Sequence, residues 1–493
     1  MQATYLEKAL LVTTLSKEAG NPMLVALGFL MVATFMALIM TKRMTPLLAL
    51  IIVPTAFGLF AGAGFGLGDM VMDAVKDMSG TAALLMFAIL YFGIMIDVGL
   101  FDRLVAGIQK IVGNDPAKVV MGTILLTAMV SLDGDGSTTY IVVTAALLPI
   151  YQRLGMSPLV LTCIAGLTNG TLNIVPWGGP TARAAAALKV DASDVFVPML
   201  PSLAVGLVII VLFGWQLGVA ERRRLRRERP ELWGTGFGGG NITAPFGTGK
   251  PAGGASPVAV LEAVAVKGSG REQATLNGTV LDPNRETLRP KTFYFNLVLT
   301  VAIMVLLIID IMPLPFLFMA GTALALVVNF PKVSDQVKMI SAHASEIIAV
   351  VSMVLGAAVL TGVLAGTGMV DAMSAWLVDV IPSSMGPYMA VITGLISIPA
   401  TFLMSNDAFY FGILPVLTEA GSHYGIGAVD MARASITGQP VHMQSPLVPA
   451  ILLLVSLARV ELGDHHKKVL WRSLVVALAM LATGVLVGSI SMG

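Results

Sequence analysis

Several long runs of uncharged apolar residues constrain this chain more than any other feature of its sequence. The runs from Met23 to Met40, Leu47 to Ala61 and Phe295 to Ile309 approach or reach the roughly 17 to 25 residues with which an α-helix crosses about 30 Å of hydrocarbon. Of the 493 residues only 12% are charged, whereas about a quarter are charged in a soluble domain. The number of runs favours helices over a β-barrel. The sequence therefore predicts an all-α polytopic protein embedded in the lipid bilayer.

The apolar runs and their interruptions predict about ten membrane-crossing helices. These are expected near residues 22–40, 45–65, 80–98, 157–190, 194–219, 293–311, 314–330, 345–367, 428–460 and 469–490. Two of them, 157–190 and 428–460, are interrupted by Pro and Gly and are predicted to be broken helices. Two further apolar stretches, 117–150 and 385–417, are interrupted by short polar residues, and we interpret them as re-entrant hairpins, named hairpin one and hairpin two.

The distribution of basic residues predicts how the chain is oriented. In this arrangement the short loops on one side contain Lys42, Arg43, Arg103, Lys110, Lys118, Arg153, the run Arg222 to Arg229, Lys332, Lys338, Arg459, Lys467 and Lys468. By the positive-inside rule this side is the cytoplasm. The opposite loops 368–387 and 418–430 contain no Lys or Arg, and the predicted loop 62–80 contains one Lys. We expect a multi-pass protein of the cell membrane with both termini outside.

The two parts of the chain contain the same order of predicted elements. Three helices, a hairpin, a broken helix and a last helix occur in 22–219 and again in 291–493. Pro180 and Pro446, which interrupt the two broken helices, are 266 positions apart. Because each half is expected to cross the membrane five times, the second repeat is predicted to be inverted relative to the first.

Two segments lie outside the predicted repeats. Residues 1–21 contain an apolar stretch that is too short and too mixed for a signal peptide, and we interpret them as an N-terminal extension. Residues 220–290 are first basic and then rich in Gly and Pro, with too little bulky apolar content to form a core. They are expected to be a flexible cytoplasmic linker.

Hairpin one has a polar tip, SLDGDGSTTY at 131–140. Polar residues at membrane depth are functional candidates, because placing them in hydrocarbon is unfavourable. The hydroxyl groups predicted to bind substrate oxygens are those of Ser137, Thr138 and Thr139. The carboxylates of Asp133 and Asp135 are predicted to bind a metal ion or to carry coupling protons. A solvated cytoplasmic turn is the structural alternative.

The first broken helix is interrupted by PWGGP, which does not sustain an α-helix. Such a break frees carbonyl groups for a cation and N–H groups for an anion. The residues predicted to bind substrate here are Asn173, Gly178, Gly179, Thr181 and Arg183. The Arg183 guanidinium could hold a carboxylate with two hydrogen bonds. The alternative, which the sequence leaves open, is that Arg183 extends to the outer lipid headgroups.

The second half contains two matching polar groups, SND at the tip of hairpin two and TGQPVHMQSP in the second broken helix. The residues predicted to bind substrate are Ser405, Asn406, Gln439, Gln444 and Ser445. Asp407 and His442 are predicted to take part in proton or metal coupling, although a packing role also fits His442. The remaining histidines, which are expected in loops, are His343, His423, His465 and His466. The only cysteine, Cys163, is expected to pack in the interior.

Five sequence strings together form a family pattern. They are IMTKRMTPLLALIIVP (39–54), LYFGIMIDVGLFD (90–102), SLDGDGSTTY (131–140), NIVPWGGPTARAA (173–185) and SNDAFYFGILPV (405–416). With them the chain resembles the citrate-metal:proton symporter family of the ion transporter superfamily. The resemblance implies a homodimer in which a transport domain moves like an elevator against a scaffold, with the hairpin tips and helix breaks around the substrate. It implies a scaffold of residues 22–113 and 291–382 and a transport domain of residues 114–219 and 383–493.

The charges of the candidate site favour a metal complex over bare citrate. The acids Asp133, Asp135 and Asp407 outnumber the candidate cations, Arg183 and at most His442, and would repel a tricarboxylate. A divalent ion lowers the charge of citrate to about one negative charge, and the acids then offset the metal or carry protons. We therefore predict proton-coupled symport of citrate with a divalent ion of the Mg or Ca class as co-substrate, without a permanently bound cofactor.

Other functions with the same topology stay open. One alternative is a sodium- or proton-coupled transporter of other di- or tricarboxylates or of inorganic anions. An intramembrane enzyme is not indicated, because no Ser-His, paired-Asp or HExxH arrangement occurs at a suitable spacing. The 30 basic and 29 acidic residues nearly balance, so nothing indicates nucleic acid as a partner.

Overall fold

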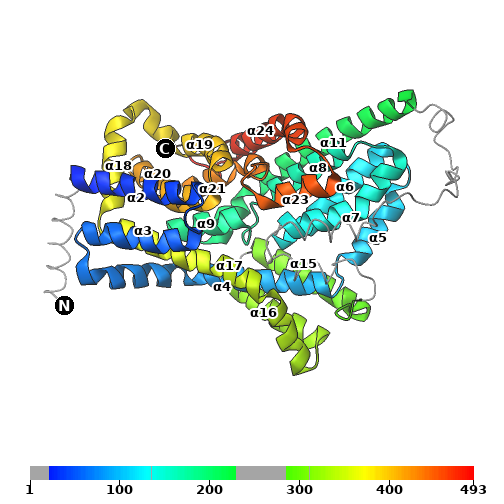
Figure 1. The fold of residues 1–493 in the computed structure, drawn as a ribbon, viewed down its shortest axis with the longest axis horizontal. Helices are drawn as coiled ribbons and strands as arrows, with labels where there is room; N and C mark the ends of the chain where they lie inside the picture. Colours follow the sequence, from blue (N-terminus) through cyan, green and yellow to red (C-terminus); the bar gives the residue numbers. More distant parts are fainter. Residues whose placement is uncertain (1–20, 135, 229–284, 310, 493) are drawn as a thin grey trace.

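The computed structural model describes residues 21–134, 136–228, 285–309 and 311–492. Every regular element in these ranges is a helix, and no strand occurs among them. Eight helical stretches in these ranges are long and apolar enough to cross a membrane. The prediction of an all-α polytopic membrane protein is therefore confirmed (Figure 1). The predicted N-terminal extension and most of the linker lie outside the described residues.

The helices follow the predicted order in both halves. In the first half they are α2 Pro22–Met40, α3 Pro46–Phe60, α4 Leu67–Asp97, α5 Asp102–Val112, α6 Pro116–Val130, α7 Gly136–Leu154, α8 Pro158–Leu172, α9 Gly179–Leu188, α10 Ala192–Phe196 and α11 Leu200–Glu228. In the second half they are α15 Phe293–Ile309, α16 Leu314–Asn329, α17 Val333–Gly366, α18 Met369–Val380, α19 Met389–Leu403, α20 Leu414–Ser422, α21 Ala428–Ile436, α22 Gln439–His442, α23 Pro449–Ala458 and α24 Leu462–Leu486. Short helices lie between them, of which the tip of hairpin one (η2, Ser131–Asp133) and a π-helix before α20 (η6, Ala408–Ile413) matter for the site.

Six of the eight membrane-length stretches coincide with predicted crossings. The other two, Pro116–Asp133 and Ser383–Leu403, are the first limbs of hairpin one and hairpin two. The helices α3, α8, α16 and α23 are apolar but have only 10 to 17 residues. Two of these, α8 and α23, are short because each is one piece of a broken helix. The predicted number of about ten crossings counts each broken helix as one crossing.

Several helices extend into stretches that were expected to be loops or linker, and α5 and α18 lie within such stretches. The prediction of a loop over 62–80 is wrong, because α4 is helical from Leu67, and α17 likewise begins at Val333, before the predicted 345. With 31 residues α4 is about 46 Å long, which exceeds the roughly 30 Å of hydrocarbon. Its charged end therefore continues as helix beyond the hydrocarbon, where Asp73 and Lys76 form an ion pair at 2.8 Å.

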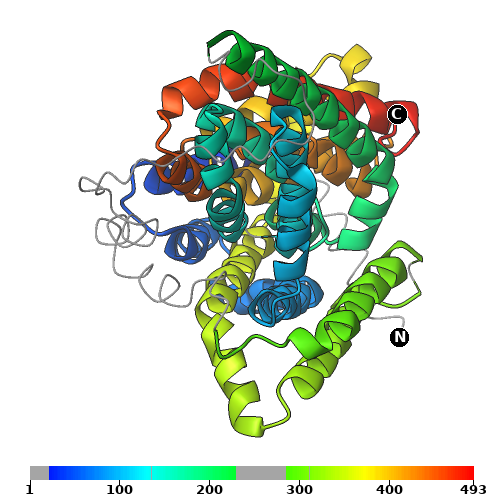
Figure 2. The ribbon, with the colours of Figure 1, turned by 90° about the vertical axis from the view of Figure 1, so that its right-hand side faces the viewer.

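The long helices α4 and α17 organise the predicted scaffold. The helix α17 packs against α3 and α4, and α16 packs against α4. The hairpin of α15 and α16 projects away from the rest of the protein (Figure 2). Its outer face is apolar and open, with Tyr294 70% and Val298 68% exposed. Because the chain is a membrane protein, such a face suits contact with lipid.

Candidate functional site

The structure brings the four predicted polar segments together. Side-chain hydrogen bonds join the first helix break to hairpin one, to hairpin two and to the second break. The second break in turn bonds hairpin two. Segments far apart in the sequence therefore meet at one polar centre, whose role in substrate binding stays a prediction.

Two glycines shape the first break, between α8 and α9. A side chain on Gly178 would collide with the Asn173 carbonyl oxygen, so only glycine lets the chain fold back here. A side chain on Gly179 would come within 2.6 Å of Arg183 Nη1. Backbone crowding thus requires glycine at 178, whereas a side chain at 179 would displace the Arg183 guanidinium.

Arg183 forms an ion pair with the tip of hairpin two. Its Nε donates to Asp407 Oδ1 at 2.6 Å, and its Nη1 donates to the Gly179 carbonyl oxygen at 2.9 Å. The two charged side chains are only 21% and 12% exposed. Arg183 therefore points into the protein and not toward lipid headgroups. Its positive charge is balanced by Asp407, a partner 224 positions away in the sequence.

A chain of hydrogen bonds runs beside this ion pair. Asn173 Nδ2 donates to Gln439 Oε1 at 3.0 Å, and these residues are 266 positions apart, the offset of the predicted repeats. Gln439 Nε2 donates to the Tyr410 hydroxyl at 3.0 Å and to Asn406 Oδ1 at 3.4 Å. Tyr410, which was not among the predicted residues, lies in the π-helix η6 and donates to the Ser435 carbonyl oxygen at 3.3 Å. A π-helix is rare and frequently marks a functional site.

Other predicted residues of the breaks and of hairpin two hold the local backbone. Each forms at least one hydrogen bond to a backbone group of a neighbouring turn or hairpin limb. The pairs are Thr181 Oγ1 to Ile174 O at 2.6 Å, Ala408 N to Ser405 Oγ at 3.2 Å, Ser445 Oγ to Phe402 O at 2.6 Å and His442 Nδ1 with Thr401 O at 2.6 Å. These bonds fix the shapes of the segments that surround the Arg183 and Asp407 pair.

Gln444 links the second break to α8 and α24. Its Nε2 donates to the carbonyl oxygens of Gly166 at 2.9 Å and Pro440 at 3.1 Å, and its Oε1 lies 3.2 Å from His465 Nε2. Since Nε2 faces two carbonyl oxygens, Oε1 accepts from His465, whose Nδ1 lies 3.2 Å from the Thr162 hydroxyl. Both polar atoms of this fully buried side chain bind the protein itself. Gln444 thus joins the second break to α8 and α24, and its contact with substrate stays a prediction.

The prediction that the remaining histidines lie in loops is wrong for three of the four. His465 and His466 lie in α24, and His343 lies in α17, where its Nε2 is 3.0 Å from Asp97 Oδ2 of α4. Only His423 follows a helix end, after α20. The charged residues around these histidines are typical of loops between membrane helices. In the structure they lie at the polar ends of the long helices α17 and α24.

Hairpin one contributes a partly buried cluster of polar residues. Thr139 donates to Asp133 Oδ1 at 3.4 Å, and Asp133 is only 8% exposed. Ser137 and Thr138 lie in the first turn of α7, and Asp135 lies outside the described residues. Among the residues that the structure describes, no group of three or more His, Cys, Asp or Glu side chains could hold a metal ion. That Asp133 and Asp135 bind metal stays a prediction.

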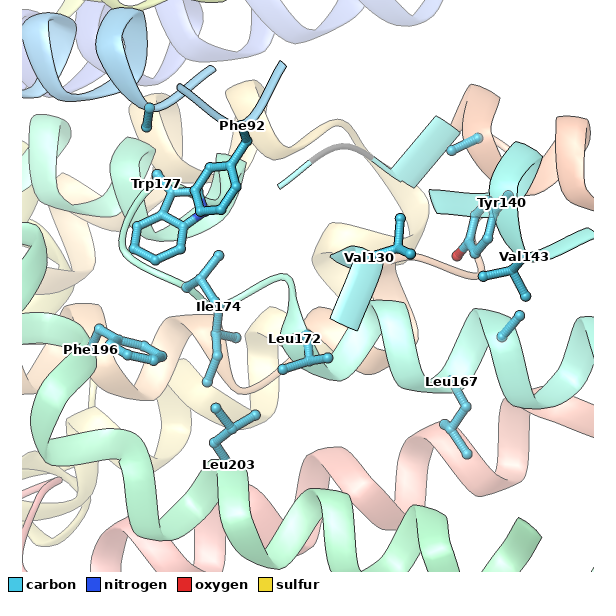
Figure 3. Packing of buried hydrophobic residues seen from close by; sticks show 14 of the residues in the cluster. Phe92, Val130, Tyr140, Val143, Leu167, Leu172, Ile174, Trp177, Phe196 and Leu203 are labelled. Atoms are coloured by element: carbon cyan, nitrogen blue, oxygen red, sulfur yellow. The ribbon is translucent and has the colours of Figure 1, made fainter. Parts of the chain in front are cut away.

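Trp177 of the first break joins hairpin one to the predicted scaffold, a contact that the sequence did not reveal. Its Nε1 donates to the Leu132 carbonyl oxygen at 2.8 Å. Its ring stacks on Phe92 of α4 with centroids 5.3 Å apart (Figure 3) and meets Phe318 of α16 edge-on at 5.0 Å. The two predicted domains thus touch at an apolar, aromatic surface beside the polar centre.

A second contact between these two parts is ionic. Lys189 follows α9 with a left-handed backbone (φ 57°), and its Nζ lies 2.8 Å from Asp77 Oδ2 of α4. Both side chains are nearly half exposed, at 49% and 43%. Such an exposed pair adds little stability and can be broken without a large penalty.

Comparisons with known proteins all identify transporters as similar to this chain. The model of the CitMHS family, described as "Citrate transporter", matches residues 10–438. A "Citrate transporter" of Bacillus subtilis (strain 168) is 46% identical, over 95% of this chain and 100% of the relative. A "Mg(2+)/citrate complex secondary transporter" of the same organism is 44% identical, over 95% and 99%. The crystal structure of the YdaH transporter of Alcanivorax borkumensis is similar in fold, with a TM-score of 0.50, 16% identity and coverage of 86% of this chain and 90% of that one.

Proposed function

The chain belongs to the CitMHS citrate transporter family, and from this premise we propose that it carries citrate as a complex with a divalent metal ion in symport with protons. The family and its similar relatives are transporters and not enzymes, and the chain is a multi-pass membrane protein. We propose the divalent ion as cargo that moves with citrate, and not as a permanently bound cofactor.

The observation that carries this proposal is the charge balance of the polar centre. Asp407 neutralises Arg183, and the neighbouring Asn173, Gln439 and Asn406 are uncharged amides. The described residues of this centre therefore offer no excess positive charge to a bare tricarboxylate. A metal–citrate complex with about one negative charge matches such a site better, since amides and N–H groups can bind its oxygens. The similarity to a relative named as an Mg(2+)/citrate complex secondary transporter supports the same substrate.

Asp407 offers a route for proton coupling. A substrate carboxylate can bind Arg183 only if it shares the guanidinium with Asp407 or displaces that carboxylate. A proton on Asp407 removes the competing charge and frees Arg183 for the substrate. His442 also interacts electrostatically with both members of the pair. Protonation and substrate binding would then favour each other, as symport requires.

We further propose an elevator-like movement within a homodimer, as the family resemblance implies. The predicted transport domain meets the scaffold through the Trp177 aromatic contacts and the Lys189 and Asp77 pair. Stacked rings and an exposed ion pair stabilise this position of the transport domain only weakly, so the domain can move to another position. The transport domain can therefore slide as a unit that carries both Arg183 and Asp407.

Uptake into proteoliposomes tests the proposal. With Mg²⁺ or Ca²⁺ present and an inward proton gradient, labelled citrate is expected to accumulate. A chelator that removes divalent ions is expected to reduce uptake to the level of protein-free vesicles. Full uptake in metal-free buffer would contradict transport of a metal complex. Full uptake driven by sodium alone, at equal pH on both sides, would contradict proton coupling and favour the alternative of a sodium-coupled carboxylate transporter.

A further inference from the structure

Asn169 is a buried amide for which the described part of the chain provides no hydrogen-bond acceptor. Its side chain is 5% exposed, and its Nδ2 has no partner among the residues that the structure describes. A buried donor without an acceptor destabilises a protein by about 1 to 3 kcal/mol. Native proteins keep such a group mainly where a water molecule, an ion or a ligand completes it.

The position of this amide is at the polar centre. Asn169 lies in the last turn of α8, one turn before Asn173, so both residues project from the same side of the helix. A Cβ on Gly136, at the start of α7, would lie 3.0 Å from Asn169 Nδ2 and 3.0 Å from Met443 Cε of the second break. The amide is therefore enclosed by hairpin one and close to the second broken helix.

The amide has no equivalent in the other half of the chain. At the repeat offset of 266, which relates Asn173 to Gln439, the position of Asn169 is taken by Ser435. The Ser435 hydroxyl donates to the Ala432 carbonyl oxygen at 2.7 Å and is thus satisfied within its own helix. The free donor occurs on one side of the centre only, which suits an asymmetric ligand.

We propose that Asn169 is a substrate-binding residue, whose side-chain N–H group donates to a carboxylate or hydroxyl oxygen of the metal–citrate complex. This inference rests on the function proposed above. Because the amide group donates only from nitrogen, the ligand atom must be an oxygen acceptor and not the metal ion. Asn169 and Arg183 would then bind the substrate from the two sides of the first helix break.

The test is isothermal titration of purified protein with citrate and Mg²⁺, together with the melting temperature of each variant. In Asn169→Ala we expect an affinity about tenfold lower or worse, with a melting temperature close to that of the wild type, because no bond within the protein is lost. Asn169→Asp keeps the shape but offers a negative acceptor, and should bind at least as weakly. Thr168→Val, which removes a neighbouring buried hydroxyl that also lacks a partner, is the matched control and should bind normally.

Three results would overturn the inference or its premise. Wild-type affinity in Asn169→Ala would show that the amide binds no substrate oxygen and at most holds a water molecule. Loss of folding in Asn169→Ala, but not in Thr168→Val, would show a structural role instead. If the wild-type protein itself binds no citrate with or without Mg²⁺, the proposed function fails, which is distinguishable from failure of Asn169 alone.

Discussion

Replacing Arg183 with alanine is expected to weaken citrate binding by about one to two orders of magnitude, because one charge-assisted contact contributes about 1.5 to 3 kcal/mol. Arg183→Lys keeps the charge but loses the planar, two-pronged geometry, so a smaller but substantial loss is expected. Isothermal titration with citrate and Mg²⁺ measures both. Unchanged affinity in Arg183→Ala would remove this residue from the substrate site.

Two further variants separate binding from stability. Arg183→Ala leaves Asp407 largely buried without its cation, so the double variant Arg183→Ala/Asp407→Asn should recover folding but not citrate affinity. Arg433→Lys is the matched control, since Arg433 is 17% exposed and pairs with Asp430, which is outside the four predicted polar segments. It should bind citrate like the wild type.

The variant Asp407→Asn reports on the coupling itself. In Asp407→Asn the carboxylate that competes with the substrate for Arg183 is replaced by a neutral amide, so at neutral pH the affinity for the metal–citrate complex should be at least that of the wild type. Citrate uptake by this variant should no longer respond to an inward proton gradient. Uptake that still responds to the gradient in Asp407→Asn would place the coupling proton on another group.

Fixing the scaffold to the transport domain is expected to abolish transport. Cysteines at Asp77 and Lys189, in a Cys163→Ser background that removes the native thiol, can be joined by a short bifunctional thiol reagent. A reagent is needed because a lysine and aspartate pair spans more than the Cα separation of a disulfide. If the domains slide past each other, the bridge should reduce citrate uptake to background, and a reductant that cleaves the reagent should restore it.

A matched pair within one helix controls for the chemistry. Asp73 and Lys76 of α4 form a similar exposed ion pair at 2.8 Å, and both belong to the scaffold. The same reagent on cysteines at these two positions should leave uptake unchanged. Full uptake by the bridged 77 and 189 variant would contradict movement at this contact.

The fold was largely predictable because apolar length is a property of each segment alone. The run from Met23 to Met40 specifies its own helix, α2, whatever it packs against. The prediction failed where helices continue beyond the hydrocarbon, as in the first turns of α4 and around His465 in α24. Charged residues in these places show that the segment is exposed to water, but they do not show that the helix has ended. The ends of long helices depend on tertiary packing that no single segment encodes.

The sequence predicted which segments are polar, but it did not predict which of their residues pair with one another. Polar residues inside apolar helices identified both breaks and both hairpin tips, yet nothing local pairs Arg183 with Asp407, 224 positions away. Gln444 looked like its neighbours in sequence, but its amide bonds α8 and His465. Trp177 and Asn169 were overlooked because their importance depends on the residues that surround them in space, which the local sequence does not specify.

The most direct test of the account is the ratio in which citrate and metal cross the membrane. Proteoliposomes of the wild-type protein are loaded under an inward proton gradient with labelled citrate and a labelled divalent ion, and both labels are counted in the same vesicles. Transport of the complex predicts equal amounts of citrate and metal at every time, with both uptakes lost together in Arg183→Ala. Accumulation of citrate without metal, at the same rate, would contradict the account.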